Sequence, residues 1–203
     1  MMPTPRLTDR LTQAFYDRPT ALVARELIGK LLLHRQGPNW LGGWIVETEA
    51  YLHTRDPASH SARGQTASNA SMFDHPGMLY VYPIHARYCM NAVTESAGRG
   101  AAVLIRAIEP VWGITAMQQH RGHQDLRRLT RGPAMLCQAL AIDRRDDGRS
   151  FIDDQRLGIF DGGGVPPRTV IATRRIGISK AQRRKLRFID PHSNYLSRKF
   201  KLD

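Results

Sequence analysis

The chain of 203 residues has few cysteines and no long apolar run, and each shortage excludes a class of protein. Its two cysteines cannot build a disulfide framework or a four-thiolate metal site, so we expect a reducing, cytoplasmic compartment. No run approaches the roughly 20 apolar residues of a membrane-spanning helix, and the polar N-terminal segment lacks the core of a signal peptide. We therefore predict a protein that is neither exported nor partnered with a membrane.

Lysine is also scarce, although the chain is strongly basic. Thirty Lys and Arg against eighteen Asp and Glu give a net charge of +12, which favours anionic partners. Only five of the thirty cations are lysines, and arginine binds phosphate through two parallel hydrogen bonds. The stretch 174–187 alone holds seven cations and no acid, so we predict that it faces the phosphates of a nucleic acid.

Composition and length indicate one globular domain. Hydrophobic residues make up 41% of the chain and charged residues 24%, as in ordinary globular proteins, and a chain of this length commonly forms a single core. We predict one domain over residues 1–203, with an N-terminal extension at 1–18 and a surface excursion at 143–167. The excursion is predicted because acidic and glycine-rich stretches follow one another there.

The predicted strands occur in pairs separated by turns. Runs at Leu31–His34 and Gly43–Tyr51 flank the turn residues 37–39, which is typical of a hairpin. Because strands cluster in hairpins and do not alternate with helices, we predict an α+β fold with a mainly antiparallel sheet and peripheral helices. Further strands are predicted at 79–82, 88–94, 102–108, 157–160, 169–173 and 186–189, and helices at 19–28, 111–119 and 133–142.

Two acids and an aromatic ring share one face of the predicted strand Gly43–Tyr51. Glu47, Glu49 and Tyr51 point the same way because strand residues alternate with a period of two. They could be the exposed face of an edge strand, since Glu is usually solvated. They could instead form a general base beside an aromatic platform, because the strand leads into a long polar loop, 53–77, whose His60 could meet them.

Longer motifs favour the second interpretation. In order along the chain they read VETEAY at 46–51, DPASHS at 56–61, MF at 72–73, GMLYVY at 77–82, YCMN at 88–91, VLIRAIEP at 103–110 and GPAMLCQAL at 132–140. With these motifs the chain resembles the alkyladenine (3-methyladenine) DNA glycosylase family from about Leu22 to Ser197, and 175–177 and 186–188 resemble that family's last strands. The resemblance implies a curved sheet with a DNA-inserting hairpin.

The resemblance also implies an enzyme of base excision repair, which flips a damaged purine out of double-stranded DNA and hydrolyses its N-glycosidic bond. Attack at the deoxyribose C1′ passes through an oxocarbenium-like state, so a carboxylate can take a proton from water and stabilise the developing charge. By resemblance Glu49 is this base. Arg106 would bond Glu49 or the DNA backbone and keep the carboxylate ionised; its alternative is a plain structural or phosphate-binding arginine.

By the same resemblance four residues bind the flipped base. Tyr51 and Tyr82 would form the faces of the pocket, and His60 would stack and hydrogen-bond to the purine edge. Asn91 would discourage excision of normal guanine by crowding its exocyclic amine. Each residue has a structural alternative, because tyrosines on strands more often pack in the core and an asparagine can be buried for structural reasons.

Two departures from the family pattern concern DNA contacts. The family commonly carries a tyrosine at the hairpin tip that fills the gap left by the flipped base, whereas this chain is one residue shorter there and has His85 at that position. Arg87 and Tyr88 are the alternatives for this wedge. Met135 stands where a basic residue that contacts DNA is expected.

The lysines and histidines bear on the reaction type. Glycosylases that also cut the strand form a Schiff base through an amine, and the five lysines fall outside the pocket motifs, so we predict hydrolysis by water without lyase activity. No cofactor and no metal is expected, because the close pair His120 and His123 lies in an Arg-rich stretch more simply explained as a phosphate-binding loop.

These expectations combine into one prediction of function. The chain is expected to be a monofunctional DNA glycosylase for purines of the 3-methyladenine, 7-methylguanine, hypoxanthine and ethenoadenine type, and to leave an abasic site. We expect a monomer associated with the nucleoid. The alternative is a non-catalytic, basic nucleic-acid-binding module, which would gain nothing from an acid in a pocket that faces a polyanion.

Overall fold

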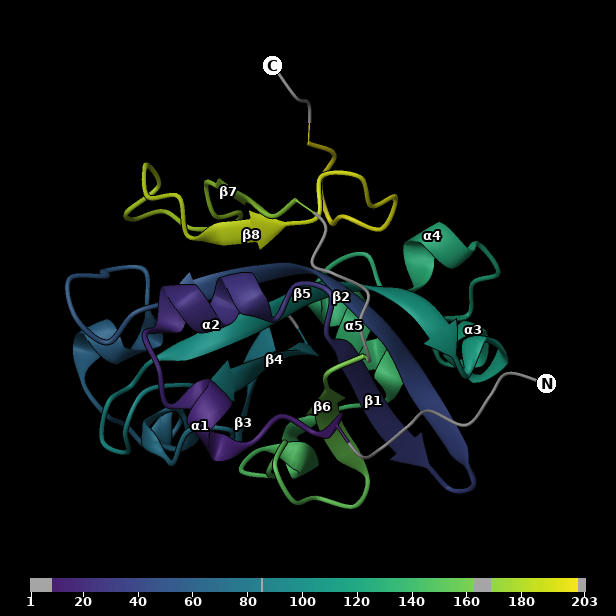
Figure 1. Ribbon diagram of the computed structural model, residues 1–203, viewed down its shortest axis with the longest axis horizontal. Coiled ribbons are helices and arrows are strands. Elements are labelled where there is room, and N and C mark those ends of the chain that lie inside the picture. Colours follow the sequence, from purple (N-terminus) through teal and green to yellow (C-terminus); the bar gives the residue numbers. More distant parts are fainter. Residues whose placement is uncertain (1–8, 85, 163–168, 201–203) are drawn as a thin grey trace.

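The computed structural model describes residues 9–84, 86–162 and 169–200 (Figure 1). Its strands are β1 (Leu31–Gln36), β2 (Asn39–Tyr51), β3 (Leu79–Ile84), β4 (Arg87–Val93), β5 (Ala102–Trp112), β6 (Leu157–Phe160), β7 (Ile171–Thr173) and β8 (Arg187–Ile189). Its α-helices are α1 (Gln13–Tyr16), α2 (Thr20–Glu26), α3 (Ile114–Arg121), α4 (Leu126–Leu129) and α5 (Pro133–Leu140). Short 3-10 helices are η2 (His60–Arg63), η3 (Ala70–Phe73) and η4 (Arg144–Asp146).

All eight strands belong to one sheet, and every pairing between them is antiparallel. The order is β3-β4-β5-β2-β1-β6, and β8 pairs with both β2 and β7. Strand β2 is the centre of the sheet: β5 runs along one of its edges, while β1 and then β8 pair with the other. The predicted α+β fold with a mainly antiparallel sheet is therefore confirmed.

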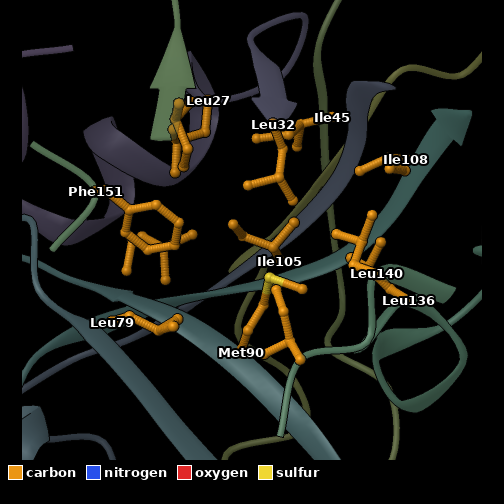
Figure 2. Packing of buried hydrophobic residues seen from close by; sticks show 14 of the residues in the cluster. Leu27, Leu32, Ile45, Leu79, Met90, Ile105, Ile108, Leu136, Leu140 and Phe151 are labelled. Carbon is orange, nitrogen blue, oxygen red and sulfur yellow. The ribbon is translucent and has the colours of Figure 1, made fainter. Parts of the chain in front are cut away.

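The two faces of the sheet are divided by the period-two alternation of its strands. On β3, Leu79 and Val81 enter the main hydrophobic core, whereas Tyr80 and Tyr82 pack on the opposite face. Helices α2 and α5 cover the core face, and Figure 2 shows Leu27, Met90 and Ile105 converging there with the other labelled side chains. The opposite face, which we call the site face, is left for polar and aromatic residues.

The end of β5 differs from the prediction of a helix at 111–119. Val111 and Trp112 complete the strand, and the helix begins only at Ile114. The break occurs at Gly113, whose φ of 70° suits glycine, and a Cβ there would lie 2.6 Å from the carbonyl oxygen of Trp40. The close approach of Gly113 to β2 therefore fixes the boundary between β5 and α3. Helical periodicity alone does not reveal this boundary.

Two segments predicted to be peripheral are partly built into the core. Tyr16, in the predicted extension 1–18, is fully buried, and Arg10 donates to the carbonyl oxygens of Phe151 (3.0 Å) and Leu157 (2.8 Å). Within the predicted excursion 143–167, Phe151 is fully buried and β6 pairs with β1. Tyr16 and Phe151 are therefore core residues within segments predicted to be peripheral, because neighbouring charged residues masked these large apolar side chains. Strand β6 is the strand predicted at 157–160.

In the described ranges of the chain, no helix combines the length and apolar character needed to cross a membrane.

Candidate active site

A small hollow opens on the site face of the sheet, and aromatic side chains dominate its walls. It brings together four predicted residues that lie far apart in the sequence, from the end of β2 to β4. Two further wall residues, Met72 and Tyr80, were missed, although each lies inside a quoted motif. The lining residues are Tyr51, His60, Met72, Tyr80, Tyr82 and Asn91.

His60 is oriented by the tyrosines around it. Its Nδ1 lies 2.9 Å from the Tyr80 hydroxyl, and its ring meets the Tyr82 ring edge-on with centroids 4.5 Å apart. Burial raises the pKa of Tyr80 to about 12, whereas burial and then Arg63 lower the pKa of His60. When the Tyr80 hydroxyl donates to Nδ1, the neutral imidazole carries its own proton on Nε2.

Asn91 is held by the same wall. Its side chain is 3% exposed, and its Nδ2 donates to the Tyr80 carbonyl oxygen at 3.1 Å. This hydrogen bond fixes which end of the amide is the donor. Asn91 therefore lines the hollow and also binds the Tyr80 carbonyl. Its predicted place in the pocket and its alternative structural role are thus compatible.

The outer edge of β3 is covered by side chains from the segment after α5. Asp147 accepts hydrogen bonds from the Val81 amide (2.7 Å) and from the Ser71 hydroxyl (2.8 Å), and Arg144 donates to the Val81 carbonyl oxygen. Arg144 Nη1 lies 3.4 Å from Asp147 Oδ2, so the two side chains form an ion pair. Arg144 and Asp147 thus bind the Val81 backbone groups that a neighbouring strand would otherwise bind, next to Tyr80 and Tyr82. No local sequence signal distinguished Asp147 from its acidic neighbours.

Glu49 is fully buried, and three donors reach its carboxylate. The Tyr51 hydroxyl lies 2.8 Å from Oε2, the Ile176 amide 2.8 Å from Oε1, and Arg106 Nη1 3.3 Å from Oε2. Burial raises the pKa of Glu49 above its ordinary value, although Arg106 and the two hydrogen bonds oppose this rise. A carboxylate with a raised pKa is a stronger base once it is ionised.

Glu47 is fully buried too, and its carboxylate is held much more strongly. Arg187 Nε (2.6 Å), Arg106 Nε (3.1 Å) and the Ser197 hydroxyl (2.7 Å) reach Oε1, and the Ser197 amide (2.6 Å) reaches Oε2. Burial favours the neutral form, but Arg187 and Arg106 outweigh it and lower the pKa of Glu47. Because β2 is central and both glutamates are buried, the interpretation of an exposed edge strand is wrong.

Arg106 on β5 joins the two acids. It is 7% exposed, and its Nη2 also approaches the Ser197 hydroxyl at 3.4 Å. Of the roles left open by the sequence, the structure has Arg106 beside Glu49, with Glu47 as a second partner.

A wider hollow adjoins the aromatic one and shares Tyr51, His60 and Tyr82 with it. Arg63 and Lys180 lie on its walls, so cationic side chains border the approach to the site. Lys180 is outside the quoted motifs, and the sequence did not indicate that an amine borders this region. Ile84, at the end of β3, also lines this hollow and is 39% exposed.

The predicted wedge, His85, lies outside the described residues. The alternatives flank the same hairpin: Arg87 is exposed and pairs with Ile84, whereas Tyr88 is half-buried against the main core. Exposure thus favours Arg87 over Tyr88 as a side chain able to reach a partner.

Three further residues named in the sequence analysis have the following surroundings in the structure. His120 and His123 each use Nδ1 in a contact with the backbone, at Ala139 and Asp125. Met135 is half-buried, with its sulfur beside Gly132.

The basic run 174–187 is divided between the surface and the interior. Arg175 forms a buried, two-pronged pair with Asp56, and Arg187 is bound to Glu47. The prediction that the whole run faces phosphates is therefore wrong for these two residues, because they neutralise buried acids. Arg174, Lys180, Arg183 and Lys185 are exposed.

A curled antiparallel sheet, a tyrosine-lined hollow and a buried carboxylate beside it can receive a flat aromatic group and act on a bond next to it. The family model described as methylpurine-DNA glycosylase matches residues 14–194. A Rhodopirellula baltica protein is 54% identical over 94% of this chain and 84% of its own length, and one from Methanoculleus marisnigri is 44% identical over 93% and 99%. Both are named 3-methyladenine DNA glycosylase.

The chain belongs to the methylpurine-DNA glycosylase family, as the resemblance in its motifs predicted. It is therefore a DNA glycosylase, a hydrolase of DNA repair.

Proposed function

We propose that this glycosylase removes alkylated and deaminated purines from double-stranded DNA, with Glu49 as the general base that activates water for attack at C1′. The observation that carries the proposal is the 2.8 Å hydrogen bond from the Tyr51 hydroxyl to Glu49, because Tyr51 also lines the aromatic hollow. A base stacked on Tyr51 would have its glycosidic bond close to that carboxylate.

The linings of the two hollows support a flipped base. Three tyrosines and His60 wall the inner hollow, and their flat rings suit the faces of one purine. The outer hollow would take the sugar and its phosphates beside Arg63 and Lys180. Flipping costs only a few kcal/mol, and a damaged or mispaired base costs less.

The chemistry of the walls supports selection for damaged purines. Purines methylated at a ring nitrogen carry positive charge, which tyrosine faces attract. For deaminated purines, His60 Nε2 can donate to an oxygen on the purine edge, and an amino group at that position cannot accept this hydrogen bond. Asn91 lies on the same wall, where its amide would meet the exocyclic amine of guanine.

Water would attack C1′ as the glycosidic bond breaks. In its ionised form Glu49 would accept the water proton and stabilise the oxocarbenium-like charge, and Arg106 would stabilise the ionised carboxylate. The products would be the free base and an abasic site.

The direct test uses a duplex that contains one hypoxanthine or one 3-methyladenine, with alkali to reveal abasic sites. We expect strand breaks only after alkali. Borohydride trapping on the same duplex tests for a Schiff base; because Lys180 borders the outer hollow, Lys180→Ala is the matched variant. A covalent adduct that disappears in this variant would contradict hydrolysis by water alone, and no excision of any modified purine would contradict the enzymatic proposal.

The wedge is tested by separate alanine substitutions. We expect His85→Ala to lose more activity on a paired lesion than on a mispaired or single-stranded one, because nothing would fill the emptied stack. Arg87→Ala and Tyr88→Ala are the matched comparisons. Equal losses on both substrates for His85→Ala would exclude His85 as the wedge.

A further inference from the structure

Each oxygen of Glu49 is bound by a donor that lies next to Arg175. The Ile176 amide, which reaches Oε1, belongs to the next residue in the chain. The Tyr51 hydroxyl, which reaches Oε2, belongs to a ring whose centroid lies 4.6 Å from the Arg175 guanidinium carbon. Of the three donors that bind the Glu49 carboxylate, Tyr51 is in contact with Arg175 and Ile176 follows it in the chain.

Arg175 is itself rigidly fixed. Its Nη1 and Nη2 bind the two Asp56 oxygens at 2.7 and 2.6 Å, and Nη1 also donates to the Ala50 carbonyl oxygen at 2.9 Å. Asp56 in turn accepts from the Leu52 amide at 3.0 Å. Both side chains of the pair are fully buried. The pair thus ties the segment after β7 to the end of β2, on either side of Tyr51.

The buried Nε of Arg175 has no hydrogen-bond partner among the described residues. Leaving a buried donor unpaired reduces the stability of the folded state. The guanidinium is thus placed to meet Asp56, Ala50 and the Tyr51 ring, and not to satisfy all of its own donors.

We propose that the Arg175–Asp56 pair is a positioning device for the catalytic base: it holds the Tyr51 hydroxyl and the Ile176 amide on the two oxygens of Glu49. This inference rests on the proposed role of Glu49. Neither Arg175 nor Asp56 reaches the reacting atoms, so both act through Tyr51 and Ile176.

The charged and titratable groups around Glu49 determine how its pKa would change if the Arg175–Asp56 pair were broken. Glu47 and Tyr51 face it from β2, Arg106 from β5 and Cys89 from β4. Burial keeps Tyr51 and Cys89 protonated at neutral pH, and Arg187 on the neighbouring β8 is directed at Glu47. Loss of the Ile176 and Tyr51 hydrogen bonds would therefore raise the pKa of Glu49 further, since both favour its charged form.

The test compares Arg175→Lys with Arg25→Lys in the intact enzyme. Lysine keeps the charge but loses the two-pronged bond and the flat stacking surface. Since a misplacement of 1 Å can cost about 10²-fold, we expect Arg175→Lys to lower kcat roughly 10- to 100-fold with little change in KM, and to move the acid limb of kcat to higher pH. Arg25 is exposed on α2 and lies outside the basic run 174–187, so Arg25→Lys should leave kcat and the acid limb unchanged.

A second variant keeps the proposal testable if Arg175→Lys folds poorly. In Arg175→Met with Asp56→Leu, apolar groups replace the buried pair, which often preserves stability. Rates are normalised to the folded fraction measured by circular dichroism. A folded variant with the wild-type kcat and acid limb would overturn the proposal, as would a loss of rate that only follows the folded fraction. Failure of the proposed function is distinct: Glu49→Gln would then remain active.

Discussion

Glu47 and Glu49 are two identical residues on one strand, two positions apart and both fully buried, yet their surroundings differ in almost every respect. Glu47 faces two guanidinium groups and two donors of Ser197, whereas Glu49 faces one guanidinium group, one phenol and one amide. The pKa of the first is lowered and that of the second is raised. When neighbouring acids have their pKa values moved apart, they can take different roles, one structural and one catalytic.

The largest effect that would sharpen this comparison is the loss of catalysis in Glu49→Gln. General bases typically contribute about 10²–10⁴-fold, so we expect a fall of that size in the single-turnover excision rate. Binding to the lesion duplex should persist, because the aromatic walls remain. The assignment of the two acids would be reversed if Glu49→Gln excised normally and Glu47→Gln were inactive for excision while folded.

Glu47→Gln should act mainly on stability. Removing one partner of a buried ion pair costs about 3–5 kcal/mol, because Arg187 and Arg106 would keep their charge with less compensation. For a chain of this size each kcal/mol lowers Tm by about 2–4 °C. Thermal unfolding followed by circular dichroism measures this, with Glu49→Gln as the matched variant; equal Tm losses in the two would contradict the division of roles.

The pH dependence of stability should also distinguish the acids. The folded-state pKa of Glu47 lies below its ordinary value of 4.5, so its stabilising contribution is present above that value and is lost as pH falls through the folded pKa. The pKa of Glu49 is shifted in the opposite direction, so the free energy of unfolding falls as the pH rises above 4.5 and the buried carboxyl ionises. The gap in unfolding free energy between wild type and Glu47→Gln should therefore narrow below pH 4.5, whereas Glu49→Gln should gain relative stability from acid to neutral pH. Urea titrations at several pH values check both signs.

The smallest effect concerns DNA affinity. Lys180 lines the outer hollow, whereas Arg187 is bound to Glu47, so only the first is free to meet a phosphate. We expect Lys180→Ala to reduce the slope of log affinity against log salt by about one, and Arg187→Lys to leave it unchanged in the folded protein. Fluorescence anisotropy on undamaged duplex measures the slopes. A reduced slope for Arg187→Lys would imply that the run 174–187 is more exposed to DNA than its contacts indicate.

Much of the fold could be predicted from local pattern. The hairpin of β1 and β2, the strand β6 and the helix α5 follow from alternation, turn residues and a proline at a helix start, which act over a few residues. Local patterns did not predict the burial of Tyr16 and Phe151, because a single large side chain in a polar stretch gives no periodic signal.

The sequence by itself determined the chemistry available to this protein: a strongly basic chain, alternating faces that put Glu47, Glu49 and Tyr51 together, and the motifs of one enzyme family. Only the tertiary structure decided which partners each acid received. Arg106, Ile176 and Ser197 lie 57, 127 and 150 positions from the acids they bind. A carboxylate's pKa depends on such neighbours and on its burial, so two glutamates with the same local pattern became different groups.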